Sequence, residues 1–243
     1  MKYSVIIGTY AGQNNLSKMI LAILGMTIPP EEIIVWSNYN EQNPFDYSEL
    51  KNQYKHIQFI ECSGNDGCFS RFAMAYLIKS PYVMVFDDDT VPGKRWAENC
   101  IESMKKIGDG ILGTRGVTLA GAKYQSRNSA GIGAYNEDIK ECDLVGHSWF
   151  FKRENIKYLF GTLPIHWVTG EDIQLSACAK IAGIRTYAPP HPKENKEFWG
   201  STERGLGNNR SRLCYIDSNQ THKRTETVQF WIKNGWKPLF MEK

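Results

Sequence analysis

The sequence lacks the patterns that would assign it to a membrane-spanning, metal-cluster or nucleic-acid-binding class. No apolar run approaches the about 20 residues that a membrane-spanning helix requires, and the opening MKYSVIIGTY enters a strand-like run without a signal-peptide pattern. There is no Cys-x-x-Cys pair, and the formal net charge is only +3, with the basic residues scattered. We therefore expect a soluble cytoplasmic protein, or a domain excised from a larger one, with no nucleic-acid partner and no membrane span.

The six cysteines also lack histidines at zinc-site spacing. Their even number permits disulfides, but free thiols in a reducing compartment are favoured in a chain of 243 residues. With 42% hydrophobic residues, this length supports a sizeable core. Since no internal repeat or linker interrupts the chain, we predict a single domain over residues 1–243.

The first half alternates apolar strand-like runs with helix-like segments. Strands are expected at residues 3–10, 32–38, 56–61 and 82–86, and helices at residues 14–24 and 70–80. Helices between short apolar strands predict a mainly parallel central sheet flanked by helices, an α/β fold. Ligands of such sheets bind beyond the carboxyl ends of the strands, so residues 1–90 are expected to form a Rossmann-like nucleotide-binding half.

The second half is less regular. Residues 113–136 are rich in Gly, Ser and Ala and are predicted to form a long loop, as are the polar residues 189–219. A helix is predicted from Glu171 to Gly183, and another closes the chain before Gly235. We expect this half, residues 91–243, to bind the acceptor and to supply catalytic groups.

Three carboxylates in a row follow the fourth predicted strand in SPYVMVFDDDTVPG, residues 80–93. In an extended segment Asp87 and Asp89 point to one face and Asp88 to the other. Two carboxylates on one face suit a hard cation such as Mg²⁺ or Mn²⁺, with diphosphate oxygens completing its coordination. The alternatives are a solvated turn and a cap for a helix beginning near Pro92.

These segments resemble the nucleotide-sugar glycosyltransferases of the A type, whose Asp-x-Asp signature follows the fourth strand. VMVFDDDTV matches the signature, and YSVIIGTY matches the usual first strand. The sequence is most similar to the exostosin-like branch, family 64, in IIVWSN, in NDGCFSRFAMAYLIKSPYVMVFDDDTV and in the later blocks DLVGHSWFFKRENIKYLF, GEDIQLSACAK and THKRTETVQFWIKNGWKPL. Family 2 shares the first half and is the nearest competitor.

The resemblance implies a metal-dependent transferase of the GT-A fold with Mn²⁺ or Mg²⁺ as cofactor. Its donor would be a UDP-sugar such as a UDP-N-acetylhexosamine, and its acceptor a glycan or another hydroxyl-bearing glycoconjugate. The exostosin-like branch implies retention of anomeric configuration. An inverting, family-2-like transferase and a non-catalytic protein that binds a UDP-sugar or a glycan are the alternatives.

The resemblance also implies site residues. For the nucleotide sugar these are Thr9, Tyr10, Asn38, Asn65, Arg71, Asp87, Asp88 and Lys223. For the metal they are Asp89, Asp87 and His222, and for catalysis they are Asp172, Glu171 and Arg224. Asp172 would be the base of an inverting enzyme, or would stabilise positive charge on the sugar in a retaining one. Carboxylates at the start of a helix also compensate its dipole, which is the plainer interpretation of Glu171 and Asp172.

Overall fold

The computed structural model describes residues 1–125, 128–203 and 219–242. Its strands are β1 (Tyr3–Thr9), β2 (Glu32–Ser37), β3 (Gln58–Glu61), β4 (Tyr82–Asp87), β5 (Ile111–Val117), β6 (Asn128–Gly131), β7 (Lys140–Cys142), β8 (Leu144–Lys152) and β9 (Thr186–Ala188). The four strands predicted in the first half are all present, each within two residues of its predicted ends.

The α-helices are α1 (Leu16–Leu24), α2 (Ser48–Gln53), α3 (Ser70–Ala73), α4 (Trp96–Ile107), α5 (Lys157–Phe160), α6 (Glu171–Ile181) and α8 (Gln220–Lys233). Short 3₁₀ turns are η1 (Gln13–Asn15), η2 (Met74–Tyr76), η3 (Arg153–Ile156), η4 (Lys196–Phe198) and η5 (Leu239–Met241). The helix predicted over residues 70–80 is therefore a short α3 that continues as η2, whereas α6 and α8 lie where the sequence predicts them.

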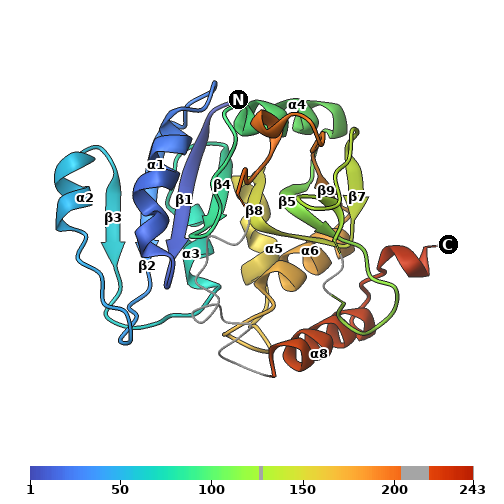
Figure 1. Ribbon diagram of the computed structural model, residues 1–243. Coiled ribbons are helices and arrows are strands. Elements are labelled where there is room, and N and C mark those ends of the chain that lie inside the picture. The colour runs from blue at the N-terminus through green and yellow to red at the C-terminus, as the bar shows by residue number, and fades with distance from the viewer. Residues whose placement is uncertain (126–127, 204–218, 243) are drawn as a thin grey trace.

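The described strands form one sheet in the order β3-β2-β1-β4-β8-β5-β9-β7, with β6 paired to β5 (Figure 1). Strands β3, β2, β1 and β4 are parallel, as predicted. Strand β8 is antiparallel to both β4 and β5, and only β9 pairs in parallel with β5 in the second half. The sheet is therefore mixed rather than mainly parallel.

The prediction of a long loop over residues 113–136 is wrong in two places, because β5 runs through the middle of the sheet and β6 (Asn128–Gly131) pairs with it. The glycines of β5 reflect crowding and not a turn. A Cβ added at Gly113 would lie 2.5 Å from Val145 Cβ, and one added at Gly116 would overlap Cys142 Sγ. Small residues let this strand lie close to its neighbours. In the other predicted loop, residues 204–218 lie outside the described residues.

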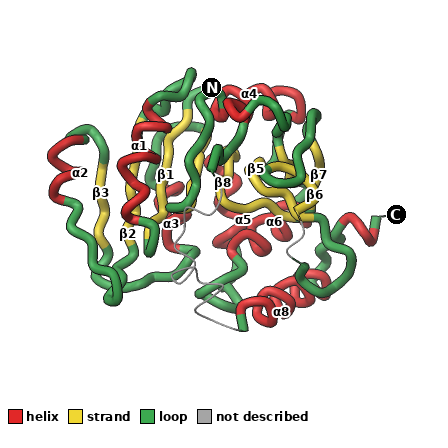
Figure 2. Tube along the Cα trace, in the orientation of Figure 1, coloured by secondary structure: helices red, strands yellow, loops and turns green. Residues whose placement is uncertain are grey.

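Both faces of the sheet are covered, so each central strand is apolar on its two sides. In β1, Val5 and Ile7 join the cluster under α1, α2 and α4, whereas Ile6 joins the one under α3, α5 and α6. A third cluster holds α8 against α6 through Ile173, Val228 and Trp231. Figure 2 shows the strands between these helices, with α8 at the edge of the molecule.

The topology gathers the candidate site at one edge of the sheet. The carboxyl ends of β1, β2 and β4 meet there with the first residues of α6 and α8 (Figure 1). The five cysteines among the described residues are free, as predicted, and Cys214 lies outside them. No helix of the described residues is both long and apolar enough to cross a membrane.

A buried carboxylate between β7 and β8 joins the end of the chain to the core. Asp143 Oδ2 accepts a hydrogen bond of 2.7 Å from Leu119 N, and Oδ1 accepts one of 2.7 Å from Leu239 N. We predict that Asp143→Ala lowers the free energy of unfolding by about 2–4 kcal/mol, because two amides lose their acceptor. Asp143→Asn keeps one acceptor and should lose about half as much. Urea unfolding measures both; equal, small losses would contradict the assignment.

Candidate functional site

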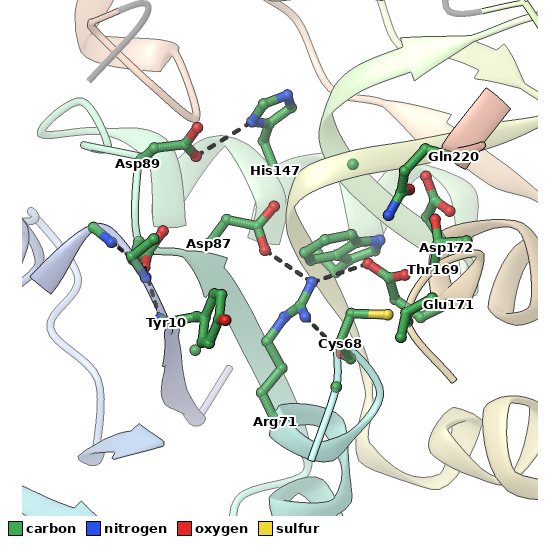
Figure 3. A pocket seen from close by; sticks show the side chains of 18 of the residues that line it. Tyr10, Cys68, Arg71, Asp87, Asp89, His147, Thr169, Glu171, Asp172 and Gln220 are labelled. Atoms are coloured by element: carbon green, nitrogen blue, oxygen red, sulfur yellow. Dashed lines mark hydrogen bonds and ion pairs between the residues drawn. The ribbon is translucent and has the colours of Figure 1, made fainter. Parts of the chain in front are cut away.

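The candidate site is a cavity of about 320 Å³ between the ends of β1 and β4 on one side and α6 and α8 on the other. Carboxylates from Asp87 to Asp89 line one end, and Asp172 and Gln220 line the other (Figure 3). The volume lies at the lower end of the range typical of small-molecule sites.

Asp88 shapes the loop that follows β1. Its Oδ2 accepts hydrogen bonds from the main-chain N–H groups of Tyr10, Ala11 and Gly12, at 2.9, 3.1 and 2.7 Å, and from Thr9 Oγ1 at 3.2 Å. Gly12 is needed here, since an added Cβ would lie 2.6 Å from Asp88 O. Oδ2 of Asp88 therefore holds this loop, and the contact of Asp88 with the donor sugar stays a prediction.

The carboxylates of Asp87 and Asp89 come together, as predicted, but a turn and not an extended segment brings them there: β4 ends at Asp87, and Thr90 N donates a hydrogen bond of 3.2 Å to Asp87 O. Together with His147 they offer ligand atoms that all lie within 4.8 Å of one another. Burial raises the pKa of Asp87 to about 7 against the effect of Arg71, and the Asp89 carboxylate adds to the rise. Two carboxylates and an imidazole nitrogen are a donor set that Mn²⁺ or Mg²⁺ fits, because a cation there would relieve the repulsion between the carboxylates.

His147 is the functional candidate that the sequence did not reveal. The pairing of β8 with β5 shifts its register between Gly113 and Arg115, and at this bulge His147 adopts a left-handed φ of 65°. Its carbonyl accepts a hydrogen bond of 3.0 Å from Thr90 Oγ1, and its Nδ1 lies 3.5 Å from Asp89 Oδ1. Gly146 beside it was a signal, since a glycine within a strand often marks a bulge.

His222, which the sequence placed at the metal, does not line the cavity. Its side chain is 74% exposed, and its Nε2 lies 3.4 Å from Glu226 Oε1, one turn along α8. His147 takes the place that was predicted for His222, because the antiparallel pairing of β8 with β4 brings the imidazole of His147 to the end of β4.

Arg71 on α3 joins the two ends of the cavity. Its Nη2 lies 2.8 Å from Asp87 Oδ1 and 3.1 Å from Glu171 Oε1, and its Nη1 donates to Cys68 O (Figure 3). The guanidinium carbon lies 5.3 Å from the centre of the Trp149 ring. The charge of Arg71 is thus compensated by two carboxylates of the protein itself. This favours a structural role for Arg71 over the predicted contact with a phosphate.

The two carboxylates at the start of α6 differ in acidity although both are buried. Burial would raise the pKa of Glu171, but Arg71 and Arg224 outweigh it and hold the pKa below its usual value. Burial raises the pKa of Asp172, with only partial compensation from Arg224. Asp172 is therefore the better proton acceptor of the pair.

Of the two basic residues predicted on α8, Arg224 lines the cavity and Lys223 does not. Arg224 Nε donates a hydrogen bond of 3.0 Å to Thr169 Oγ1, and Nη1 donates one of 2.7 Å to Tyr124 OH. Its Nη2 lies 3.9 Å from Asp172 Oδ2. Arg224 is held in place beside Asp172 by these contacts.

The remaining predicted residues all line the cavity, with different freedom to bind a ligand. Thr9 and Asn38 are buried; Asn38 Nδ2 donates to Gly67 O at 3.0 Å and so holds the loop before α3. Asn65 is exposed and accepts a hydrogen bond from Gly67 N through Oδ1. Tyr10 presents its ring at the end of β1, where it can stack on a planar base.

The arrangement thus combines a cation-binding corner with a second, buried carboxylate across one cavity. A cation held at the corner would neutralise a polyanion, and Asp172 can accept a proton. This is what a group transfer from a diphosphate to a hydroxyl requires.

Comparisons with known proteins agree with this fold. The family described as Glycosyl transferase family 2 matches residues 4–160. The structure of S. aureus TarS 1-349 in complex with UDP-GlcNAc is 15% identical and aligns with a TM-score of 0.68, covering 96% of this chain and 67% of that chain. S. aureus TarS 1-349 is 14% identical with a TM-score of 0.58, covering 78% of this chain and 60% of that one.

A longer S. aureus TarS chain is also 14% identical, with a TM-score of 0.57, and this chain spans 37% of its length. At such identities the likeness establishes the fold, a single-domain GT-A α/β fold. No curated protein sequence matches this one.

The Arg71 bridge can be tested through stability. We predict that Arg71→Met lowers the free energy of unfolding by about 3–5 kcal/mol, since it leaves the Asp87 and Glu171 carboxylates uncompensated in a buried site. Arg185→Met is the control: it removes the exposed ion pairs to Glu141 and Glu242 and should cost less than about 1 kcal/mol. Similar losses for the two variants in urea unfolding would refute the bridge.

Proposed function

The chain belongs to glycosyl transferase family 2 and is a glycosyltransferase; on this premise we propose that it transfers a sugar from a UDP-sugar to a hydroxyl of a glycan or glycoconjugate, with Mn²⁺ or Mg²⁺ as cofactor. The observation that carries the proposal is the cluster of Asp87, Asp89 and His147 facing the buried Asp172 across one cavity. UDP as the nucleotide is supported by the TarS structure that holds UDP-GlcNAc and by another that holds UDP.

We assign the donor's diphosphate to the corner formed by Asp87, Asp89 and His147, which would hold the metal. When bound, the metal supplies positive charge against the charge that develops on the diphosphate as the bond to the sugar breaks. Tyr10 stacks on the base and Asn65 contacts it, so residues 1–90 hold most of the nucleotide, while residues 91–243 contribute His147 to the metal and supply the acceptor side.

Asp172 is proposed as the base of an inverting transfer. Its carboxylate takes the proton of the acceptor hydroxyl while that oxygen bonds to the anomeric carbon. The sugar–phosphate C–O bond breaks at the same time, and its electron pair leaves with UDP. The raised pKa of Asp172, caused by burial, favours proton acceptance, whereas Glu171 is neutralised by Arg71 and holds Arg71 in place.

Inversion replaces the retaining outcome that the exostosin-like resemblance implies. The family match covers the first two thirds of the chain and is to family 2, so the likeness of the later blocks to family 64 stays a prediction. Nuclear magnetic resonance of the fresh product distinguishes the two, because the anomeric proton reports the configuration directly.

We predict that Asp89→Asn weakens binding of UDP in the presence of Mn²⁺ by at least about tenfold and abolishes transfer, since a neutral amide is a poor ligand for a hard cation. Titration calorimetry with UDP, with and without Mn²⁺, measures the change. Asp138→Asn, at an exposed aspartate, is the matched control. Unaltered Mn²⁺-dependent binding in Asp89→Asn would remove the metal site from the proposal.

We predict that Asp172→Asn lowers the rate of transfer by about 10²–10⁴-fold, because the base is lost. Binding of UDP with Mn²⁺ should stay unchanged, since Asp172 lies at the other end of the cavity. In the wild type, the raised pKa of Asp172 should place the acidic limb of the rate–pH profile above the pH expected for an ordinary aspartate. A profile without that limb would assign the base elsewhere.

A further inference from the structure

Gln220, the first residue of α8, presents a buried polar group to the cavity. Only 6% of the residue is exposed, and it lines the same cavity as Asp172 and Arg224. Its Nε2 is inaccessible to solvent and has no hydrogen-bond partner among the residues that the structure describes. Figure 3 places Gln220 beside Asp172, across the cavity from Asp89 and His147.

Buried amide N–H groups are nearly always hydrogen-bonded, so an unpartnered one that lines a binding cavity points to a ligand. Among the described residues lining this cavity, three carry a buried side-chain atom of this kind: Arg71 at Nε, Glu171 at Oε2 and Gln220 at Nε2. Arg71 and Glu171 are joined to each other by an ion pair through their other atoms. Gln220 is neutral, and no such pair accounts for its burial.

The neighbours of Gln220 fix its position. It precedes Arg224 by one helical turn, so the two side chains share a face of α8. Arg224 is anchored to Thr169 and Tyr124, and Thr227 Oγ1 donates a hydrogen bond of 2.9 Å to Lys223 O, while Val228 and Trp231 pack in the core. The amide is thus carried by a well-packed helix, as a residue that selects a ligand requires.

We propose that Gln220 is a specificity-determining residue that donates a hydrogen bond from Nε2 to an oxygen on the transferred sugar of the donor. This rests on the proposed function: with the diphosphate at Asp87, Asp89 and His147, the sugar extends toward Asp172 and so toward Gln220. The Nε2 group only donates, so the complementary ligand atom is an acceptor oxygen. It can be a ring hydroxyl or the carbonyl of an N-acetyl group.

The test compares UDP-sugars with UDP itself, because UDP lacks the sugar. In Gln220→Met, which keeps the length of the side chain but has no donor, calorimetry in Mn²⁺ should show UDP-GlcNAc binding weakened about tenfold to a hundredfold. Binding of UDP should be unchanged. Gln229→Met, an exposed glutamine on the same helix, is the matched control and should bind both ligands like the wild type.

The outcomes separate the possibilities. Weaker binding of both UDP-GlcNAc and UDP-Glc assigns the contact to a hydroxyl, and weaker binding of UDP-GlcNAc alone assigns it to the N-acetyl carbonyl; both support the proposal. Equal losses for the UDP-sugars and UDP, or no loss at all, overturn it. If Gln220→Met does not fold, Gln220→Asn withdraws the donor by one methylene and should show the same sugar-specific loss. A wild type that binds none of these nucleotides refutes the proposed function instead.

Discussion

The site depends on one guanidinium group. Arg71 is the positive charge between Asp87, at the end of β4, and Glu171, at the start of α6, and these elements belong to opposite halves of the chain. Removing it would leave two carboxylates in a poorly solvated place. The geometry around Arg71 is correspondingly tight, because a Cβ added at Gly8 of β1 would overlap its side chain. The close packing of α3 against β1 and the two ion pairs therefore hold the Arg71 side chain in one position.

The charge of Arg71 also makes the neighbouring carboxylates differ in acidity. Glu171 is held ionised by Arg71, whereas Asp172, one residue on, keeps a raised pKa because it is buried. Asp88 turns one carboxylate oxygen to the main chain, whereas Asp87 and Asp89 converge with His147 at the candidate cation site. The five acidic residues of one cavity thus differ in their partners and in acidity because they have different neighbours, not because their chemistry differs.

Local sequence patterns predicted the parts of the site that depend on local structure. The apolar run before Asp87 predicted β4 and the placement of its carboxylates, and the Glu171 helix was predicted from its own pattern. His147 was not predictable in this way, because it reaches Asp89 only through the antiparallel pairing of β8 with β4 and a bulge against β5. Strand β5 is not predicted for a related reason: its glycines are required by close packing against residues that are distant in the sequence.

At position 147 the backbone conformation and the side chain favour different residues. Glycine or asparagine adopts a φ of 65° more easily than histidine does, so the bulge alone would favour either of them. The imidazole, in turn, lies beside Asp89 in the cluster with Asp87. Mutagenesis that selects for thermal stability would therefore favour replacing residue 147, and the more stable protein would have lost the imidazole of the proposed metal site.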